Sequence, residues 1–302
     1  MHFADRLAQA VKERGTPVLV GLDPRLANLP DELRELAAAD GEAAAYREFC
    51  CAVIDAVADQ VAVVKPQMAF FEELGPDGLA ALHAVVAYAR QRDLLVILDG
   101  KRNDIGSTAT AYAKAYLGAS SAWQGDALTV SPYLGDDSLE PFAQEAVAQE
   151  AGVFVLVKTS NPGGKTFQDL LIDGQPLYRC VAALVEKLAA ESAGECGYGA
   201  VGAVAGATWP EQLVELRQAM PHTWFLVPGF GAQGAGAVEV AGAFDEQGLG
   251  AIVNSSRGII FAYERGPYRE QFGQGRWREA IAAAARDMTA QLRQYTPAAR
   301  LA

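Results

Sequence analysis

Ionisable side chains follow most of the short apolar runs in this chain, at the point where each run ends. A buried strand has no structural use for such a side chain, because a charge away from water is costly unless it is paired. The densest group is LDGKRNDIG at 98–106. Alternation along an extended chain points Asp99 and Lys101 to the same side, so the two can share one site. The other polar residues at such ends are Asp23, Lys65, Lys158, Ser160 and Arg257.

Lys65 ends a neighbouring run and would extend this group to a row of alternating cations and carboxylates. The proton affinities of such a row are coupled, and the row holds an ammonium group charged beside a fixed carboxylate. Any one of these residues could instead be a charged residue at a solvent-exposed strand end. The whole set is better explained by a single site.

The elements that would position this row are eight apolar runs alternating with helical patterns. The runs are rich in Val, Leu, Ile and Ala without strict alternation, as expected of parallel strands buried on both faces. Strand followed by helix, repeated eight times, predicts a closed β/α barrel (TIM barrel), in which the carboxyl ends of the strands converge on one face. The runs are 18–22, 61–64, 94–98, 127–130, 153–157, 200–205, 224–227 and 251–253.

A doubly wound open sheet is the structural alternative. It would need a glycine-rich dinucleotide turn after the first strand, whereas this chain has Gly21-Leu22-Asp23-Pro24 there. The sequence therefore favours the barrel.

The 302 residues are expected to form one barrel domain, since barrels of this size are common. Two connections are longer than barrel loops usually are, and we interpret 24–40 and 161–199 as insertions, the second with a hairpin at Asp173-Gly174. The pattern near 275–296 predicts a C-terminal helix packed on the outside of the barrel.

Composition excludes several classes of function. The net charge of −12 disfavours a nucleic-acid partner, so an anionic substrate would have to be bound by local cations. No stretch is apolar enough to span a membrane, and the charged, amphipathic N-terminus does not resemble a signal peptide, so we expect a cytoplasmic protein. The four cysteines and three histidines lack metal-binding or redox spacing, so we expect no metal and free thiols.

Five motifs in order resemble the orotidine 5′-phosphate decarboxylase family, in its longer bacterial branch. They are GLDP, VVKPQ, the DxKxxD of Asp99, Lys101 and Asp104, PGFGAQG and NSSRG, spread over about residues 19–258. The resemblance implies a cofactor-free carboxy-lyase of pyrimidine biosynthesis that converts orotidine 5′-phosphate to uridine 5′-phosphate. It also implies a homodimer with shared active sites and a small nucleotide as the partner molecule.

The resemblance also implies roles for individual residues. Lys101 corresponds to the proton donor to C6, Asp99 to the carboxylate beside the substrate carboxylate, and Lys65 to the lysine between Asp99 and the ribose hydroxyls. Asp104 corresponds to the aspartate that crosses into the neighbouring subunit's site, with Thr108 and Ile105 beside it. The remaining assignments are Asp23 to a ribose hydroxyl, Ser160 to the pyrimidine ring, and Gly231, Gln233, Arg257 and Gly258 to the phosphate.

Loss of carbon dioxide leaves a carbanion that no cofactor motif of this chain would delocalise, so electrostatic stabilisation by the protein is expected. One rival is a magnesium-dependent sugar-phosphate decarboxylase or synthase, which would need an acidic residue where this chain has Lys65. Turnover that survives a chelator would separate the two. A non-catalytic phosphate-binding barrel, the other rival, would have no reason for the charged row. Lys158 is assigned no role.

Overall fold

The structure, a computed structural model, describes residues 1–231 and 236–301. Its centre is a closed barrel of parallel strands in the order β1-β10-β9-β8-β5-β4-β3-β2. Because β1 pairs with both β2 and β10, the sheet has no open edge, which confirms the predicted barrel and rules out the doubly wound alternative. The strands are β1 (Val18–Leu22), β2 (Val63–Pro66), β3 (Leu95–Arg102), β4 (Ala127–Val130), β5 (Gly152–Lys158), β8 (Val201–Ala205), β9 (Phe225–Val227) and β10 (Ala251–Ser255).

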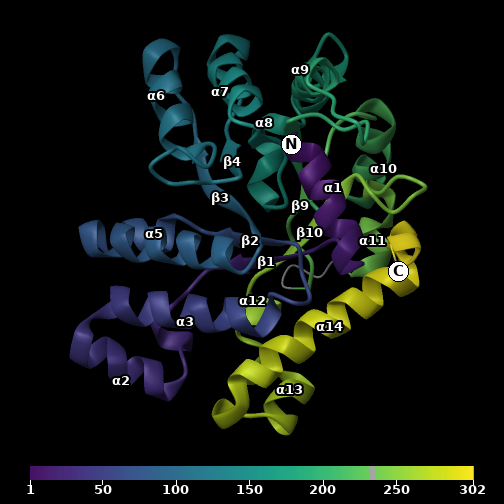
Figure 1. The fold of residues 1–302 in the computed structure, drawn as a ribbon. Helices are drawn as coiled ribbons and strands as arrows, with labels where there is room; N and C mark the ends of the chain where they lie inside the picture. The colour runs from purple at the N-terminus through teal and green to yellow at the C-terminus, as the bar shows by residue number, and fades with distance from the viewer. Residues whose placement is uncertain (232–235, 302) are drawn as a thin grey trace.

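Helices surround the barrel, as Figure 1 shows. The longer ones are α1 (Phe3–Arg14), α2 (Asp31–Asp40), α3 (Glu42–Val57), α5 (Gly75–Gln91), α6 (Gly106–Tyr116), α7 (Asp136–Ala148), α9 (Leu177–Glu191), α10 (Pro210–Ala219) and α14 (Trp277–Tyr295). The shorter ones are α4 (Ala69–Glu72), α8 (Lys165–Gln168), α11 (Ala237–Val240), α12 (Arg257–Ile260) and α13 (Gly266–Gln271). Short 3-10 helices are η1 (Leu26–Asn28), η2 (Pro162–Gly164), η3 (Ala241–Ala243), η4 (Ala262–Glu264), η5 (Gln274–Arg276) and η6 (Pro297–Leu301).

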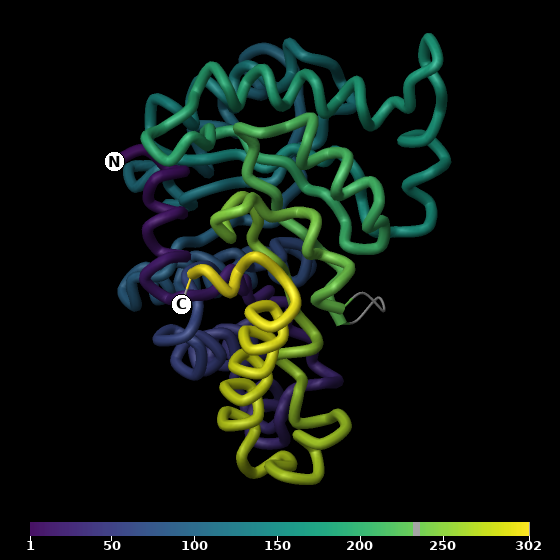
Figure 2. Tube along the Cα trace, turned by 90° about the vertical axis from the view of Figure 1, so that its right-hand side faces the viewer, coloured from purple at the N-terminus to yellow at the C-terminus, as the bar shows by residue number. Residues whose placement is uncertain are grey.

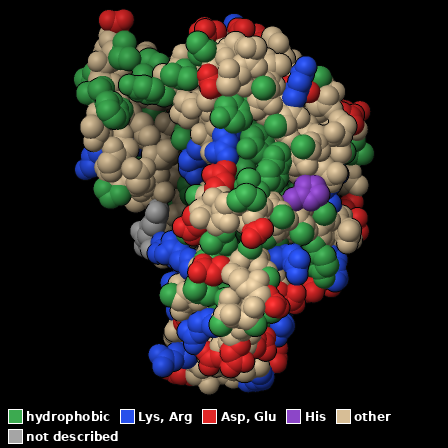
Figure 3. Space-filling view, turned by 90° about the vertical axis from the view of Figure 1, so that its left-hand side faces the viewer, with side chains coloured by type: hydrophobic (Ala, Val, Ile, Leu, Met, Phe, Trp, Pro, Cys, Tyr) green, Lys and Arg blue, Asp and Glu red, His purple; other side chains and the backbone are tan. Residues whose placement is uncertain are grey.

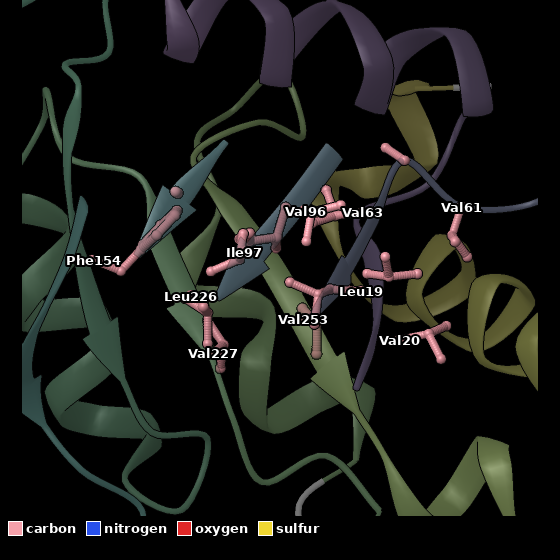
Figure 4. Packing of buried hydrophobic residues seen from close by; sticks show 14 of the residues in the cluster. Leu19, Val20, Val61, Val63, Val96, Ile97, Phe154, Leu226, Val227 and Val253 are labelled. Carbon is pink, nitrogen blue, oxygen red and sulfur yellow. The ribbon is translucent and has the colours of Figure 1, made fainter. Parts of the chain in front are cut away.

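The strands are buried on both faces because one face packs inside the barrel and the other packs under the helices. Figure 4 shows Leu19, Val63, Ile97 and Val253 among the side chains of this core. Residues paired in register point to the same side, so Leu19 and Val63 share one face, and the following Gly21–Lys65 pair shares it two residues later. The interior is therefore hydrocarbon along most of its length and becomes polar toward the carboxyl ends of the strands.

Helix α1 closes the opposite end of the barrel. The ring of Phe3 packs edge-on against Phe154 with centroids 6.2 Å apart. Gly152 makes room for it, since a Cβ there would lie 2.3 Å from the Phe3 ring. Gly202 does the same for Phe154, whose ring would be 2.6 Å from a Cβ at that position. Two aromatic rings thus fill the space that two glycines leave.

The expected C-terminal helix corresponds to α14, which runs along the outside of the barrel in Figure 1. Its first residue, Trp277, is buried and stacks on Phe49 of α3 with ring centroids 5.6 Å apart. Phe261 also stacks on Phe49, with ring centroids 5.7 Å apart. The helix is held by aromatic packing along α3.

The connection from β5 to α9 holds η2, α8 and the two-stranded antiparallel sheet of β6 (Leu171–Ile172) and β7 (Gln175–Pro176). The turn between them has left-handed backbone at Asp173 (φ 50°) and Gly174 (φ 81°), so the hairpin expected there is present. Figure 2 shows this segment, in teal, projecting from the rest of the molecule. The other long connection, 24–40, is occupied by η1 and α2.

Within residues 1–231 and 236–301, none of the helices combines the length and the apolar character needed to cross a bilayer.

Replacing Phe3 by Ala is expected to lower the free energy of unfolding by about 3–5 kcal/mol, because the cavity opens between two rigid glycine-lined strands that cannot collapse onto it. Urea denaturation at fixed protein concentration measures this. The control, Tyr295→Ala on α14, removes an aromatic side chain that is 51% exposed, and should cost less than about 1 kcal/mol. Equal losses for the two variants would show that α1 does not close the barrel.

Candidate active site

Three neighbouring strand ends bring four polar side chains together at the carboxyl face of the barrel. Lys65 comes from β2, Asp99 and Lys101 from β3, and Thr129 from β4. The alternation that points Ile97 inward also points Asp99 inward, and Ile97 pairs with Ala127, two residues before Thr129. The predicted convergence of Lys65, Asp99 and Lys101 is therefore present.

Asp99 is the centre of this group and accepts four hydrogen bonds. Its Oδ2 accepts from Lys65 Nζ at 2.6 Å and from Gln67 Nε2 at 3.0 Å. Its Oδ1 accepts from Lys101 Nζ at 2.6 Å and from Thr129 Oγ1 at 3.0 Å. The carboxylate is buried, and every contact fixes its orientation, so it has a single position in the site.

Lys101 reaches this carboxylate through an irregular backbone. The pairing of β3 with β4 shifts register between Leu98 and Arg102, and Lys101 has left-handed backbone with φ 45°. That conformation costs a residue with a Cβ roughly 1 kcal/mol or more. The Lys101 amide donates to Thr129 Oγ1 at 2.9 Å, which holds the bulge in place. Simple strand alternation correctly predicted that Asp99 and Lys101 are neighbours, but a bulge in β3 brings the Lys101 side chain to Asp99.

Lys65 and Asp99 control each other's protonation. Burial alone would raise the pKa of Asp99, but the ammonium groups of Lys65 and Lys101 and their hydrogen bonds hold that pKa far below its usual range. Burial alone would lower the pKa of Lys65, but the charges of Asp99 and Asp23 raise it above the ordinary lysine value. Both groups of the Lys65–Asp99 pair therefore stay ionised around neutral pH.

Two cavities meet at Asp99 and Lys101. One, of about 210 Å³, is lined by Lys65, Thr129 and the segment 159–161, with Leu156, Val204, Leu226 and Pro228 as its apolar wall. The other, of about 500 Å³, is lined by Asp23, Arg25, Gln67 and Phe70 among others. Lys101 and Asp99 thus stand between two chambers, of which the smaller has an apolar wall and the larger carries Asp23 and Arg25, so a ligand with two chemically different ends could lie there.

Asp23, predicted to contact a ribose hydroxyl, lines the larger cavity beyond the end of β1. Its Oδ1 is buried and accepts no hydrogen bond from any described residue. A buried acceptor without a donor is costly unless a ligand supplies one. Ser160, predicted to contact the pyrimidine ring, lines the smaller cavity together with Thr159 and Asn161.

Asp104 does not join the other three members of the DxKxxD group within one chain. Its Oδ1 accepts a hydrogen bond from the Ile105 amide at 2.9 Å, and it forms no ion pair with the described residues. Thr108 lies exposed in the first turn of α6, and the Ile105 side chain is 56% exposed. Asp104, Ile105 and Thr108 thus lie in the segment from the end of β3 to the first turn of α6, and none of them is hydrogen-bonded to Asp99 or Lys101.

The residues predicted to bind phosphate come from the ends of two paired strands. Gly231 follows β9, and Arg257 and Gly258 begin α12 just after β10. Gln233 lies outside the described residues. Arg257 is partly exposed, so its guanidinium remains open to a ligand at this end of the barrel.

Two residues of the site were not predicted from the sequence, namely Gln67 and Thr129. Gln67 lies two residues after Lys65, and its backbone bridges to Asp99, so the spacing of VVKPQ was a usable signal. Thr129 is a hydroxyl residue inside an otherwise apolar buried strand, where a polar group needs a partner.

Replacing Asp99 by Asn should destabilise the fold by about 3–5 kcal/mol at neutral pH, because it leaves the buried Lys65 ammonium without a carboxylate. The pKa of Lys65 determines how this loss of stability depends on pH. In the unaltered chain this pKa is raised, so the pair stabilises the fold below about pH 10.4 and its contribution is lost only as the pH rises above the folded-state value. In Asp99→Asn, burial lowers the pKa of Lys65 below the value in the unfolded chain, so the variant regains stability as the pH rises.

Chemical denaturation of both proteins between about pH 7 and about pH 10 should show the stability difference narrowing as the pH rises. The matched control is Asp55→Asn, which removes an exposed ion pair with Arg92. It should cost less than about 1 kcal/mol and show no such slope. A difference for Asp99→Asn that stays constant across the range would contradict the coupling of Lys65 to Asp99.

Comparison with known proteins agrees with the motifs. Residues 16–268 match the model of the Orotidine 5'-phosphate decarboxylase / HUMPS family. An orotidine 5'-phosphate decarboxylase from Rhodopirellula baltica is 55% identical over 97% of this chain and 99% of its own length. One from Haloarcula marismortui is 42% identical, covering 98% and 100%. The structure of Leishmania donovani OMP decarboxylase superposes with a TM-score of 0.76 at 33% identity, over 98% of each chain. The chain belongs to the orotidine 5'-phosphate decarboxylase / HUMPS family.

Proposed function

We propose that this chain decarboxylates orotidine 5′-phosphate to uridine 5′-phosphate, a step of pyrimidine biosynthesis, with Lys101 as the proton donor to C6. One observation carries the mechanism: the Lys101 ammonium is bound to a buried carboxylate whose other oxygen holds Lys65, at the junction of two cavities. Family membership and the 55% identical relative support the reaction.

The reaction breaks the bond between C6 and the carboxylate carbon and leaves the electron pair on C6. An ammonium group beside that carbon stabilises the developing charge and then transfers a proton to it, forming the C6–H bond. The neutral amine regains a proton from solvent, because its partly exposed side chain reaches the cavity mouth. Lys101 therefore serves first as an electrostatic partner and then as an acid.

Asp99 holds Lys101 in place and keeps its own negative charge throughout. Its low pKa means that it does not compete as the proton donor, which leaves the transfer to Lys101. Placed next to the substrate carboxylate, Asp99 would also repel it in the ground state, and we treat this contribution as secondary.

Other residues would bind the rest of the substrate. The unpaired Oδ1 of Asp23 supports a hydrogen bond from a ribose hydroxyl, with Lys65 beside it. Ser160, in the mainly apolar chamber, is assigned to the pyrimidine ring. Arg257, Gly258 and Gly231, with Gln233, are assigned to the phosphate, as is common for the last two loops of β/α barrels. Binding energy from the phosphate would then support turnover and not only affinity.

We assign Asp104 and Thr108 to the active site of a second copy of the chain, in a homodimer. The separation of Asp104 from Lys101's ion pair within one chain supports this assignment. So do large apolar side chains at the same end of the barrel, where Tyr133 is 77% exposed and Leu134 and Ile105 are also exposed. Large apolar side chains exposed in this way are common at interfaces.

We further propose a cytoplasmic location. Cys50, Cys51, Cys180 and Cys196 are all free thiols, as expected in a reducing compartment. The magnesium-dependent alternative is disfavoured by the position of Lys65, because its ammonium lies at the strand end where a metal ligand would be needed.

Replacing Lys101 by Ala should reduce turnover of orotidine 5′-phosphate by at least about 10⁴-fold, because both charge stabilisation and the proton are lost. Uridine 5′-phosphate should still bind, since the phosphate contacts remain. Ultraviolet absorbance measures turnover and calorimetry measures binding. The control Lys114→Ala removes an exposed lysine of α6 and should leave both unchanged. An active Lys101→Ala enzyme would refute the assignment.

Mixing inactive Asp104→Ala and Lys101→Ala chains should restore activity if Asp104 acts in the partner's site. Half of the dimers in an equal mixture are hybrids with one intact site of two, so recovery should approach about a quarter of the normal rate. Mixing Lys65→Ala with Lys101→Ala is the matched control, because both residues belong to the same chain's site and no hybrid site is intact. If activity did not recover after full subunit exchange, the assignment of Asp104 to the partner's site would be wrong.

A further inference from the structure

Lys158 is a buried lysine that the proposed reaction does not use. It ends β5, and its side chain is 1% exposed. Its Nζ forms an ion pair with Asp169 and lies 5.2 Å from the centroid of the Tyr178 ring and 5.3 Å from that of the Trp209 ring. A buried ammonium is costly unless paired, and a carboxylate together with two aromatic faces supplies that pairing. Such an arrangement indicates a specific role.

The partners of Lys158 come from three different elements outside the barrel. Asp169 follows α8, Tyr178 lies in the first turn of α9, and Trp209 directly precedes α10. The ammonium therefore ties the projecting segment 162–176 to the end of β5. In the space-filling view of Figure 3 this segment, at upper left, carries hydrophobic side chains on its surface and stands away from the body.

The same elements hold the backbone that follows Lys158. Gln168 of α8 accepts from the Thr159 amide at 3.0 Å and donates to Thr159 Oγ1 at 2.8 Å. From the other side, Trp209 Nε1 donates to the Thr159 carbonyl at 3.2 Å, and Thr208 Oγ1 donates to the Ser160 carbonyl at 3.0 Å. The two residues after Lys158 are thus held by α8 on one side and by the loop before α10 on the other.

That backbone forms one wall of the active-site cavity. Thr159, Ser160 and Asn161 line the 210 Å³ chamber together with Lys65, Asp99 and Lys101. Lys158 itself does not line this chamber and acts from behind the wall. Because a displacement of about 1 Å can cost on the order of 100-fold in rate, the group that fixes the wall matters for how the ligand is positioned.

We propose that Lys158 is a positioning residue for the pyrimidine end of the ligand. Through Asp169 and Trp209 its ammonium fixes α8 and the loop before α10 around Thr159, and so sets the position of Ser160 and Asn161. This inference rests on the proposed function, in which Ser160 contacts the base. The phosphate and ribose ends of the ligand are assigned to residues at the ends of β1, β2, β9 and β10 and not to the wall after β5, so their binding should not depend on Lys158.

Lys158→Met keeps an unbranched side chain one atom shorter and removes its charge, and the partly exposed Asp169 remains in contact with water. Calorimetry compares two ligands: uridine 5′-phosphate, which has a base, and ribose 5-phosphate, which has none. The dissociation constant of uridine 5′-phosphate should rise on the order of tenfold, and that of ribose 5-phosphate should stay within about twofold. A role only in stability would weaken both equally.

The matched control is Lys165→Met. Lys165 lies 6.0 Å from the same Trp209 ring but is exposed, and its loss should change neither constant. Gln168→Ala is a second test that leaves the buried ion pair intact and removes both hydrogen bonds to Thr159. It should also weaken uridine 5′-phosphate selectively. If Lys158→Met does not fold, as judged by circular dichroism, Gln168→Ala decides the question.

Ser160→Ala separates this inference from the proposed function. Selective loss of uridine 5′-phosphate binding in Ser160→Ala without any in Lys158→Met or Gln168→Ala would overturn the positioning role and leave the base contact standing. Selective loss in Lys158→Met and Gln168→Ala but not in Ser160→Ala would support the positioning role and remove Ser160 from the base contact. Equal weakening of both ligands in Lys158→Met and Gln168→Ala would overturn the inference.

Discussion

The carboxylate of Asp99 binds two ammonium groups at once, one on each oxygen, and this interaction organises the mouth of the barrel. The two lysines supply positive charge at one end of a chain whose net charge is −12, where Asp99 and Asp23 offset it. The molecule as a whole repels an anionic nucleotide, so the attraction must come from individual cations at this end such as Lys65, Lys101 and Arg257. The buried carboxylate also holds the two lysines side by side, since without it their mutual repulsion would push one of them toward solvent.

Much of the fold was predictable because burial leaves a strong signal in the sequence. All eight predicted runs are strands of the barrel, and the strands extend past the apolar runs to include Lys65, Asp99 and Lys158. They do so because the parallel hydrogen-bond ladder continues for a residue or more after the core ends. The arrangement of 162–176 was less predictable, since its exposed short elements have no periodicity that burial would impose.

The sequence predicted which residues converge in the site but not the backbone geometry that brings them together. The pairing of Asp99 with Lys65 and Lys101 followed from the topology of a barrel. The left-handed backbone of Lys101 depends on the hydroxyl of Thr129 in the next strand, so no local pattern in DGKRND predicts it. The pairing of Lys158 depends on residues 11, 20 and 51 positions away, so its role could not be read from β5 alone. Asp104 is a residue whose proposed partner belongs to another molecule.

The burial of the Lys65–Asp99 pair sets the stability of the barrel against its catalytic activity. Water is stripped from these charges when the chain folds, so an arriving ligand meets a field that needs no reorganisation. This desolvation lowers the stability of the native state. Hydrocarbon side chains of similar volume in these positions would make the barrel more stable but catalytically inactive. Thermal robustness in this fold is therefore limited by the same few atoms that make it an electrostatic catalyst.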